Sequence, residues 1–311
     1  MSTPQEEQAR RNEAVLRAMG AQQPAQPGSA EWPGQPQPAQ PEGLWVPPAG
    51  GAPAQPAAFA PEEGPGNKSL AFWVPFDALF GLIFAIVLQT IALVGFMAAQ
   101  GLSGLEDIQG LQNDPTFTLI AAPTLGLGFA VMAVMRIRLL RKLPWGWFGI
   151  HGRNVGAAIG WGTLAGFAFL AINAAFGFLF EQLGSTPDQA EQIIRPFKTA
   201  SPLQLGLLGL FIVLVGPFLE EVFFRGYALR AFRQRLGPKW GIVLSAALFS
   251  APHALSITTG FAGLLLPIFA GGLILGYVYH RTGNLWSCTI AHCINNLVGF
   301  LALLAQLSSG A

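Results

Sequence analysis

The stretch "LQLGLLGLFIVLVGPFLEEVFFRGYAL", residues 203–229, decides the fold class. Its first sixteen residues carry no charge, and a helix of roughly 20 such apolar residues crosses a bilayer core. Glu220, Glu221 and Arg225 follow directly, in a chain that is 52% hydrophobic and only 11% charged. Soluble domains carry about a quarter charged residues. We therefore interpret the chain as an integral, multi-pass membrane protein.

Apolar stretches of similar length recur after residue 69. They predict an all-α, polytopic bundle of about seven transmembrane helices. An eighth span or a re-entrant segment stays open, because one predicted span is short and another is rich in glycine. The predicted spans are 70–98, 116–135, 155–180, 203–221, 240–256, 261–279 and 285–306.

The N-terminal part has a different composition. Residues 21–66 hold 12 of the 24 prolines, together with Ala, Gln and Gly, and such a segment lacks the apolar periodicity of a folded element. We predict a disordered tail at residues 1–66 and a transmembrane bundle at 67–311. The tail has no apolar core of a signal peptide, so we expect it to be retained.

The distribution of basic residues predicts the orientation. Lys and Arg collect in short cytoplasmic loops. With the tail inside and seven spans, eleven Lys and Arg residues fall in inner loops and only Arg195 and Lys198 in outer loops. The net charge of +1 offers no basic surplus for nucleic acid. The predicted partners are instead the lipid bilayer and a membrane-associated substrate.

Five ionisable residues lie within the predicted spans: Asp77, Glu220, Glu221, His253 and His292. An unpaired charge at the bilayer centre costs about 2.5 kcal/mol or more, so each residue must face the bundle interior, water or an interface. For Asp77 we expect a structural role, with the positive dipole of the first helical turn favouring its charge. Glu221 and Arg225 share a helix face at i,i+4 and can form a clasp. Glu220 points about 100° away from this pair.

Two further motifs lie in later spans. "FSAPH", residues 249–253, places His253 one turn after Phe249, and Pro252 loosens the helix there. "HCINN", residues 292–296, places His292 and Asn296 on one face. Each motif alone is also compatible with a helix clamp. Together, a carboxylate, two imidazoles and an amide are the groups that hydrolysis requires.

These residue types predict a water-activating site. A desolvated Glu220 paired with His253 can deprotonate water, and His292 with Asn296 can supply hydrogen bonds to the oxyanion. Zinc or another divalent metal stays open, because Glu220, His253 and His292 also form a known ligand set. The three ligands would come from three helices instead of an HExxH helix. Cys288 and Cys293 lack a CxxC spacing and are interpreted as reduced core residues. We favour a site without a metal cofactor.

The ordered motifs "EEVFFR" (220–225), "FSAPH" and "HCINN" resemble those of the CPBP intramembrane proteases. That family includes the type II CAAX prenyl endopeptidases and the bacterial proteins grouped as ABI or bacteriocin-immunity proteases. The resemblance covers about residues 155–306, which we take as the protease core. The family has been described both as metalloproteases and as glutamate-dependent proteases.

The resemblance implies a role for each matching residue. Glu220 corresponds to the general base, His253 to its partner on the water, His292 and Asn296 to the oxyanion stabilisers, and Glu221 with Arg225 to the supporting pair. It implies an intramembrane endopeptidase acting on a membrane-associated peptide or protein. We expect it in a bacterial plasma membrane, with the N-terminus in the cytoplasm as the loop charges predict. A catalytically inactive scaffold or immunity protein of the same fold is the alternative, and a small transporter is a weaker one.

Overall fold

The computed structural model describes residues 69–111, 113–152, 154–184, 195–256 and 260–309. Backbone contacts divide the chain into two units, Met1–Ala52 and Pro53–Ala311, and every described residue belongs to the second. The predicted tail at 1–66 lies outside the described residues. All regular structure within them is helical, which confirms the predicted fold class.

Six helical runs in the described residues are long and apolar enough to cross a membrane. Five of them match single predicted spans to within five residues at either end. These five runs contain α2 (Leu70–Gln100), α4 (Pro115–Ala121), α5 (Pro123–Val134), the π-helix η2 (Met135–Leu140), α6 (Val155–Gln182), α11 (Phe261–Thr282) and α12 (Leu285–Ser309). The short connecting helices are α3 (Leu105–Leu111), η3 (Trp145–Phe148) and η4 (Arg195–Phe197).

The remaining run, Pro202–Ala254, is 53 residues long and contains two predicted spans. At Gly237 its backbone leaves the helix with φ 80° and ψ 171°, a conformation that favours glycine. A Cβ atom on Gly241 would lie 2.9 Å from the backbone of Arg233, although eight residues of straight helix span about 12 Å. The chain therefore doubles back at Gly237. The count of seven spans remains a prediction, since it requires both arms to cross the bilayer.

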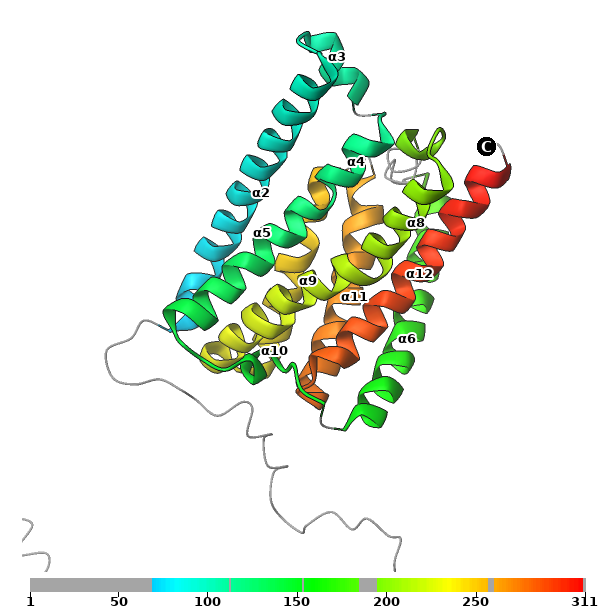
Figure 1. Ribbon diagram of the computed structural model, residues 1–311. Helices are drawn as coiled ribbons and strands as arrows, with labels where there is room; N and C mark the ends of the chain where they lie inside the picture. Colours follow the sequence, from blue (N-terminus) through cyan, green and yellow to red (C-terminus); the bar gives the residue numbers. More distant parts are fainter. Residues whose placement is uncertain (1–68, 112, 153, 185–194, 257–259, 310–311) are drawn as a thin grey trace, which may run out of the picture. The chain divides into compact units, whose positions relative to one another are not determined.

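This run contains α-, π- and 3₁₀-helical segments, and it carries the side chains of the first two motifs. It consists of α8 (Pro202–Leu210), the π-helix η5 (Phe211–Val215), α9 (Gly216–Glu221), the π-helix η6 (Val222–Leu229), α10 (Arg230–Ser250) and the 3₁₀-helix η7 (Ala251–Ser256), whose last residues lie beyond the run. Figure 1 shows these helices together with α11 and α12 in one bundle.

Glycines set the closest helix contacts in the bundle. Helix α2 packs on α5, and a Cβ atom on Gly128 would lie 2.3 Å from the carbonyl oxygen of Gly81. Helix α6 packs on α12, where a Cβ atom on Gly162 or Gly166 would lie 2.9 Å from an isoleucine. Small residues four apart allow such close approach between membrane helices.

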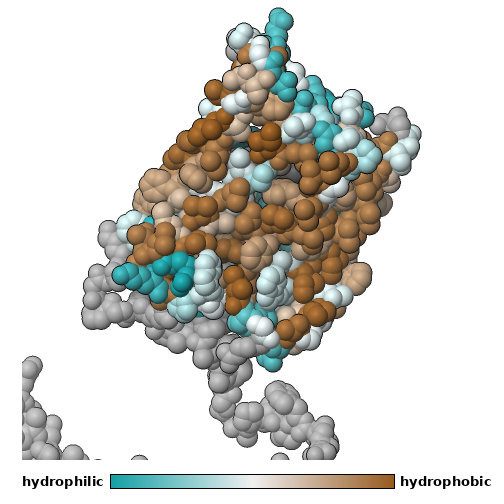
Figure 2. Space-filling model, viewed as in Figure 1, coloured by the Kyte–Doolittle hydropathy of each residue, from teal (hydrophilic) through white to brown (hydrophobic). Residues whose placement is uncertain are grey.

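The outer surface of the bundle is apolar. Leu164 on α6 is 63% exposed and Leu203 on α8 is 72% exposed. In Figure 2 hydrophobic residues cover the middle of the visible face, and hydrophilic residues gather toward its two ends. This distribution fits a bilayer around the middle of the bundle.

Asp77 is paired with two other helices. Arg136 of η2 donates hydrogen bonds of 2.8 and 2.6 Å to the two carboxylate oxygens, and the Tyr227 hydroxyl donates one of 2.5 Å. The Arg136 guanidinium also lies 4.4 Å from the Trp73 ring centroid. The expected stabilisation by the helix dipole is wrong, because α2 begins at Leu70 and Asp77 lies past the first turn. The Asp77 carboxylate is instead stabilised by the ion pair with Arg136 of η2 and by the hydrogen bond from Tyr227 of η6.

Candidate active site

The acidic pair of the first motif lies where a short α-helix ends and a π-helix begins. Glu221 is the last residue of α9 and Arg225 lies in η6. Arg225 Nη1 lies 2.7 Å from Glu221 Oε1, and both side chains are fully buried. The pairing predicted from their i,i+4 spacing is confirmed. π-Helical segments are rare and frequently occur at functional sites.

The Arg225 guanidinium has two further contacts. Its Nη2 donates a 3.3 Å hydrogen bond to the carbonyl oxygen of Gly272 in α11. Its carbon Cζ lies 4.3 Å from the ring centroid of Phe249 in α10, within the range of a cation–π contact. These two contacts add to the ion pair, although Arg225 Nε and Glu221 Oε2 are buried without a hydrogen-bond partner among the described residues. Arg225 thereby connects η6 to both neighbouring helices.

His292 of α12 contacts the same carboxylate. Its Nδ1 lies 3.0 Å from Glu221 Oε1, and the His292 side chain is 6% exposed. An ionised carboxylate can only accept hydrogen bonds, so Nδ1 carries the proton and donates it. The Glu221 carboxylate thus fixes the ring orientation of His292 and turns its Nε2 atom away from Glu221.

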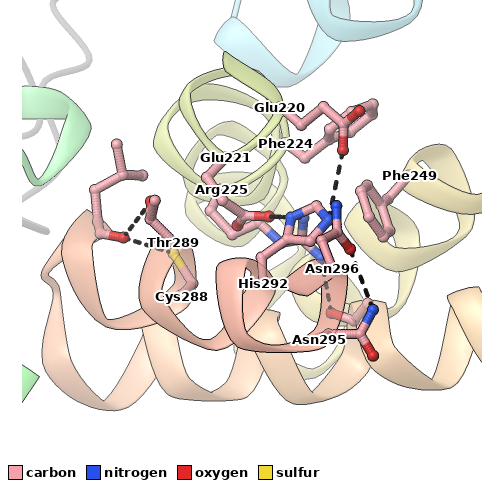
Figure 3. Close-up of polar contacts among 12 residues, drawn as sticks. Glu220, Glu221, Phe224, Arg225, Phe249, Cys288, Thr289, His292, Asn295 and Asn296 are labelled. Atoms are coloured by element: carbon pink, nitrogen blue, oxygen red, sulfur yellow. Dashed lines mark hydrogen bonds and ion pairs between the residues drawn. The ribbon is translucent and has the colours of Figure 1, made fainter. Parts of the chain in front are cut away.

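Glu220 lies on the other side of the His292 ring. Its Oε2 atom is 3.8 Å from His292 Nε2, and its side chain is 28% exposed. Figure 3 shows the two glutamates approaching the imidazole from different directions. The separation is longer than a direct hydrogen bond, and a bridging water is the usual partner at this range. Glu220 is therefore the accessible carboxylate of the pair.

His253 lies one turn after Phe249, where α10 gives way to the 3₁₀-helix η7 at Ala251. Its Nδ1 lies 3.1 Å from the Phe249 carbonyl oxygen, which can only accept, so Nδ1 donates. The Phe249 ring is edge-on to both imidazoles, with centroids 5.4 Å from His253 and 5.5 Å from His292. The Phe249 ring thus packs against both histidines.

Asn296 is held by a carbonyl of the π-helix η5. Its Nδ2 donates a 2.9 Å hydrogen bond to the Ile212 oxygen, and its Oδ1 accepts one of 3.2 Å from Asn295 Nδ2. Asn295 Oδ1 in turn accepts a 2.7 Å bond from Asn173 Nδ2 of α6. Figure 3 shows the Asn296 amide beside the His292 ring and the Asn295 amide farther from the ring, connected to Asn296.

The sequence predicted that the three motifs converge. The structure brings Glu220 and Glu221 together with His292, and its Phe249 ring joins His253 to this group. Sequence reasoning missed the bond between Glu221 and His292, because the residues are 71 positions apart. It also missed Asn173, whose only sequence signal is an amide in an otherwise apolar span.

The predicted metal ligands do not form a ligand set in this geometry. Among the residues that the structure describes, no group of three or more His, Cys, Asp or Glu side chains is placed to hold a metal ion. Glu220, His253 and His292 would have to move toward one centre to bind zinc. Cys288 is buried and both cysteines are free thiols. We derive no catalytic step through a metal.

Comparison with known proteins supports the resemblance. Residues 202–298 match the family model described as "Type II CAAX prenyl endopeptidase Rce1-like". This segment contains all three motifs, so the predicted resemblance to the CAAX proteases is confirmed over residues 202–298. No curated protein and no solved structure gave a match.

Proposed function

We propose that this protein is an intramembrane endopeptidase that hydrolyses a peptide bond with a water activated by Glu220. The observation that carries this proposal is the placement of Glu220 Oε2 at 3.8 Å from His292 Nε2, while Glu221 holds the other side of that ring. A partly exposed carboxylate beside a fixed imidazole is an arrangement that binds and polarises water.

Each residue of the site has its own role in the proposed hydrolysis. Glu220, assisted by His253, takes a proton from the water, and the water oxygen bonds to the carbonyl carbon of the peptide. The carbonyl oxygen becomes an oxyanion, for which a protonated His292 Nε2 and the second N–H of Asn296 are the donors. The C–N bond then breaks, and the proton held by Glu220 passes to the leaving nitrogen. The products are an amine and a carboxylic acid, which keeps the second proton of the water until it ionises.

Charge balance supports a protonated His292 in this proposal. Glu221 and Arg225 form one fully buried ion pair. Glu220 and an imidazolium at His292 would form a second pair at 3.8 Å. The four groups would then sum to zero, which lowers the cost of keeping them inside a membrane bundle. Both nitrogens of His292 would donate, one to Glu221 and one toward Glu220 or the oxyanion.

The proposed substrate is a membrane-associated peptide or protein. The bundle exposes an apolar surface to lipid, so a substrate held in the bilayer is already concentrated beside the site. The matching family is named for prenylated CAAX substrates, and a prenylated peptide is accordingly one probe. We further propose a bacterial plasma membrane as the location, with the N-terminus in the cytoplasm, from the loop charges.

Glu220→Gln tests this proposal. The amide keeps the shape of the side chain but cannot take a proton from water, so we expect cleavage to be lost while the fold remains. Membranes carrying wild type or variant are incubated, and released peptides are identified by mass spectrometry. Purified protein in phosphatidylcholine vesicles with a farnesylated CAAX peptide provides a second assay.

Glu181→Gln is the matched control, because Glu181 is an exposed glutamate near the end of α6. It should release the same peptides as the wild type. Wild-type cleavage by Glu220→Gln would refute Glu220 as the base. A wild type that releases nothing in either assay, with an intact fold, would instead favour the inactive scaffold.

A further inference from the structure

Three asparagine side chains form a continuous chain of hydrogen bonds that ends beside the candidate active site. Asn173 Nδ2 donates to Asn295 Oδ1 at 2.7 Å, and Asn295 Nδ2 donates to Asn296 Oδ1 at 3.2 Å. Asn296 Nδ2 donates to the Ile212 oxygen at 2.9 Å. These hydrogen bonds connect α6, α12 and η5. Asn173 lies outside residues 202–298, the segment that matches the family model.

The direction of this chain follows from its last acceptor. A backbone carbonyl such as that of Ile212 can only accept, so Asn296 must present its NH₂ group to it. The Asn296 oxygen must then face Asn295, which has to donate, and the Asn295 oxygen must face Asn173. Turning over any one amide would place two oxygens or two NH₂ groups against each other. The orientation of the Asn296 amide is therefore coupled to Asn173.

Helix packing holds Asn173 at the required depth. Gly162 and Gly166 form the contact of α6 with α12, where added Cβ atoms would lie 2.9 Å from isoleucine side chains. Phe169, which is 3% exposed, lies on the same face, and Asn173 follows it by one turn. Asn173 thus lies in the seam between α6 and α12. A shift of α6 along α12 would break the contact with Asn295.

The Asn173 amide has a second informative property. Its Oδ1 atom is buried without a hydrogen-bond partner among the described residues. Reversing the amide would place this oxygen against the Asn295 oxygen, which Asn173 now satisfies. The observed orientation leaves Asn173 Oδ1 unpaired among the described residues and keeps both hydrogen bonds that connect Asn173 to Asn296 through Asn295.

We infer that Asn173 is a positioning residue of the active site, which acts through Asn295 to hold the Asn296 amide with one N–H free for the oxyanion. This inference rests on the proposed function, since it assigns the free N–H a role in the transition state. An oxyanion donor must be aimed before the reaction to be effective. Asn173 therefore affects the turnover number and leaves substrate binding unchanged.

A double-mutant cycle tests this coupling. Asn173→Ala, Asn295→Ala and the double variant are purified as full chains, and kcat and KM are measured in phosphatidylcholine vesicles. The probe is a synthetic peptide that the wild type cleaves in the release assay. Each single variant should lower kcat by about 10- to 100-fold with KM unchanged, as misplaced groups do. The double variant should be no slower than the slower single variant, because residues acting through one another are not additive.

Two further variants provide a second test of the positioning role and a control. Asn173→Asp keeps the size of the side chain, but its ionised form cannot donate to Asn295, so kcat should fall at least as far as in Asn173→Ala. Leu164→Ala, at a lipid-facing position of the same helix that is 63% exposed, should keep the wild-type kcat. Thermal unfolding in detergent should show every variant folded at the assay temperature, with a lower midpoint for Asn173→Asp because it brings an ionised carboxylate into the bundle.

The outcomes are distinguishable. A wild-type kcat in Asn173→Ala or Asn173→Asp, or multiplicative losses in the double variant, would overturn the positioning role and leave the protease intact. A loss confined to KM would do the same. A wild type that cleaves no peptide would overturn the proposed function, and the positioning role would fall with it.

Discussion

The Nδ1 atom of His292 lies 3.0 Å from Oε1 of Glu221, the oxygen that also pairs with Arg225 at 2.7 Å. One carboxylate oxygen thus joins a guanidinium of η6 to an imidazole of α12. Because both contacts are buried, movement of either helix would leave a charged group without a partner. The buried pair of Glu221 and Arg225 thereby orients His292. Glu220 is the more exposed of the two glutamates.

Glu221→Gln should destabilise the bundle. The change leaves the fully buried Arg225 without its counter-charge, and loss of one partner of a buried pair costs about 3–5 kcal/mol. We expect a lower midpoint of thermal unfolding in detergent, together with loss of cleavage. Glu181→Gln, on an exposed part of α6, serves as the control and should unfold like the wild type. Equal stability of both variants would contradict the supporting role of Glu221.

Asp77→Asn should loosen the contact between α2, η2 and η6. Arg136 would lose its bidentate partner and Tyr227 its acceptor, at a cost of about 3–5 kcal/mol. Replacing both charged residues, as in Asp77→Leu with Arg136→Met, should cost less than either single change, because no unpaired charge remains. Unfolding midpoints of Asp77→Leu, Arg136→Met and the double variant provide the measurement. A double variant less stable than both single variants would show that the pair contributes more than charge compensation.

Gly128→Ala should separate α2 from α5. The new Cβ atom would lie 2.3 Å from the Gly81 carbonyl oxygen, so one helix backbone must move. Gly95→Ala on α2 is a matched control, since its Cβ atom would meet nothing within 4 Å. That change removes a helix-interior glycine and should raise stability by up to about 1 kcal/mol. If Gly128→Ala unfolds at the same midpoint as Gly95→Ala, the close approach of the two helices is not required for stability.

Removal of metal should leave cleavage unchanged. In the proposed reaction Glu220 and His253 move the proton of the water and His292 donates a hydrogen bond to the oxyanion, so no bound cation is needed. The purified protein is dialysed against EDTA and phenanthroline, its metal content is measured by mass spectrometry, and the peptide assay is repeated. Activity that is lost on chelation and restored by zinc would instead make Glu220, His253 and His292 metal ligands.

The sequence predicted the spans because a bilayer imposes a single strong requirement. A crossing helix needs about 20 apolar residues and must satisfy its own backbone, so Leu70–Gln100 and Val155–Gln182 could be recognised from composition and length. The turn at Gly237 is a different case. A glycine followed by proline is visible in the sequence, but the φ of 80° that reverses the chain appears only in the folded backbone.

The helical membrane class and the ordered motifs with Glu220, His253 and His292 can be read from the amino-acid sequence, because hydropathy and local spacing are properties of single segments. The pairing of Glu221 with Arg225 can be read there too, since four residues bring them to one helix face. The contacts of Glu221 with His292, of Asp77 with Arg136 and of Asn173 with Asn295 become visible only in the folded bundle. These partners are 59 to 122 positions apart. Their meeting depends on which helices pack together and at what depth, and no single segment encodes that relation.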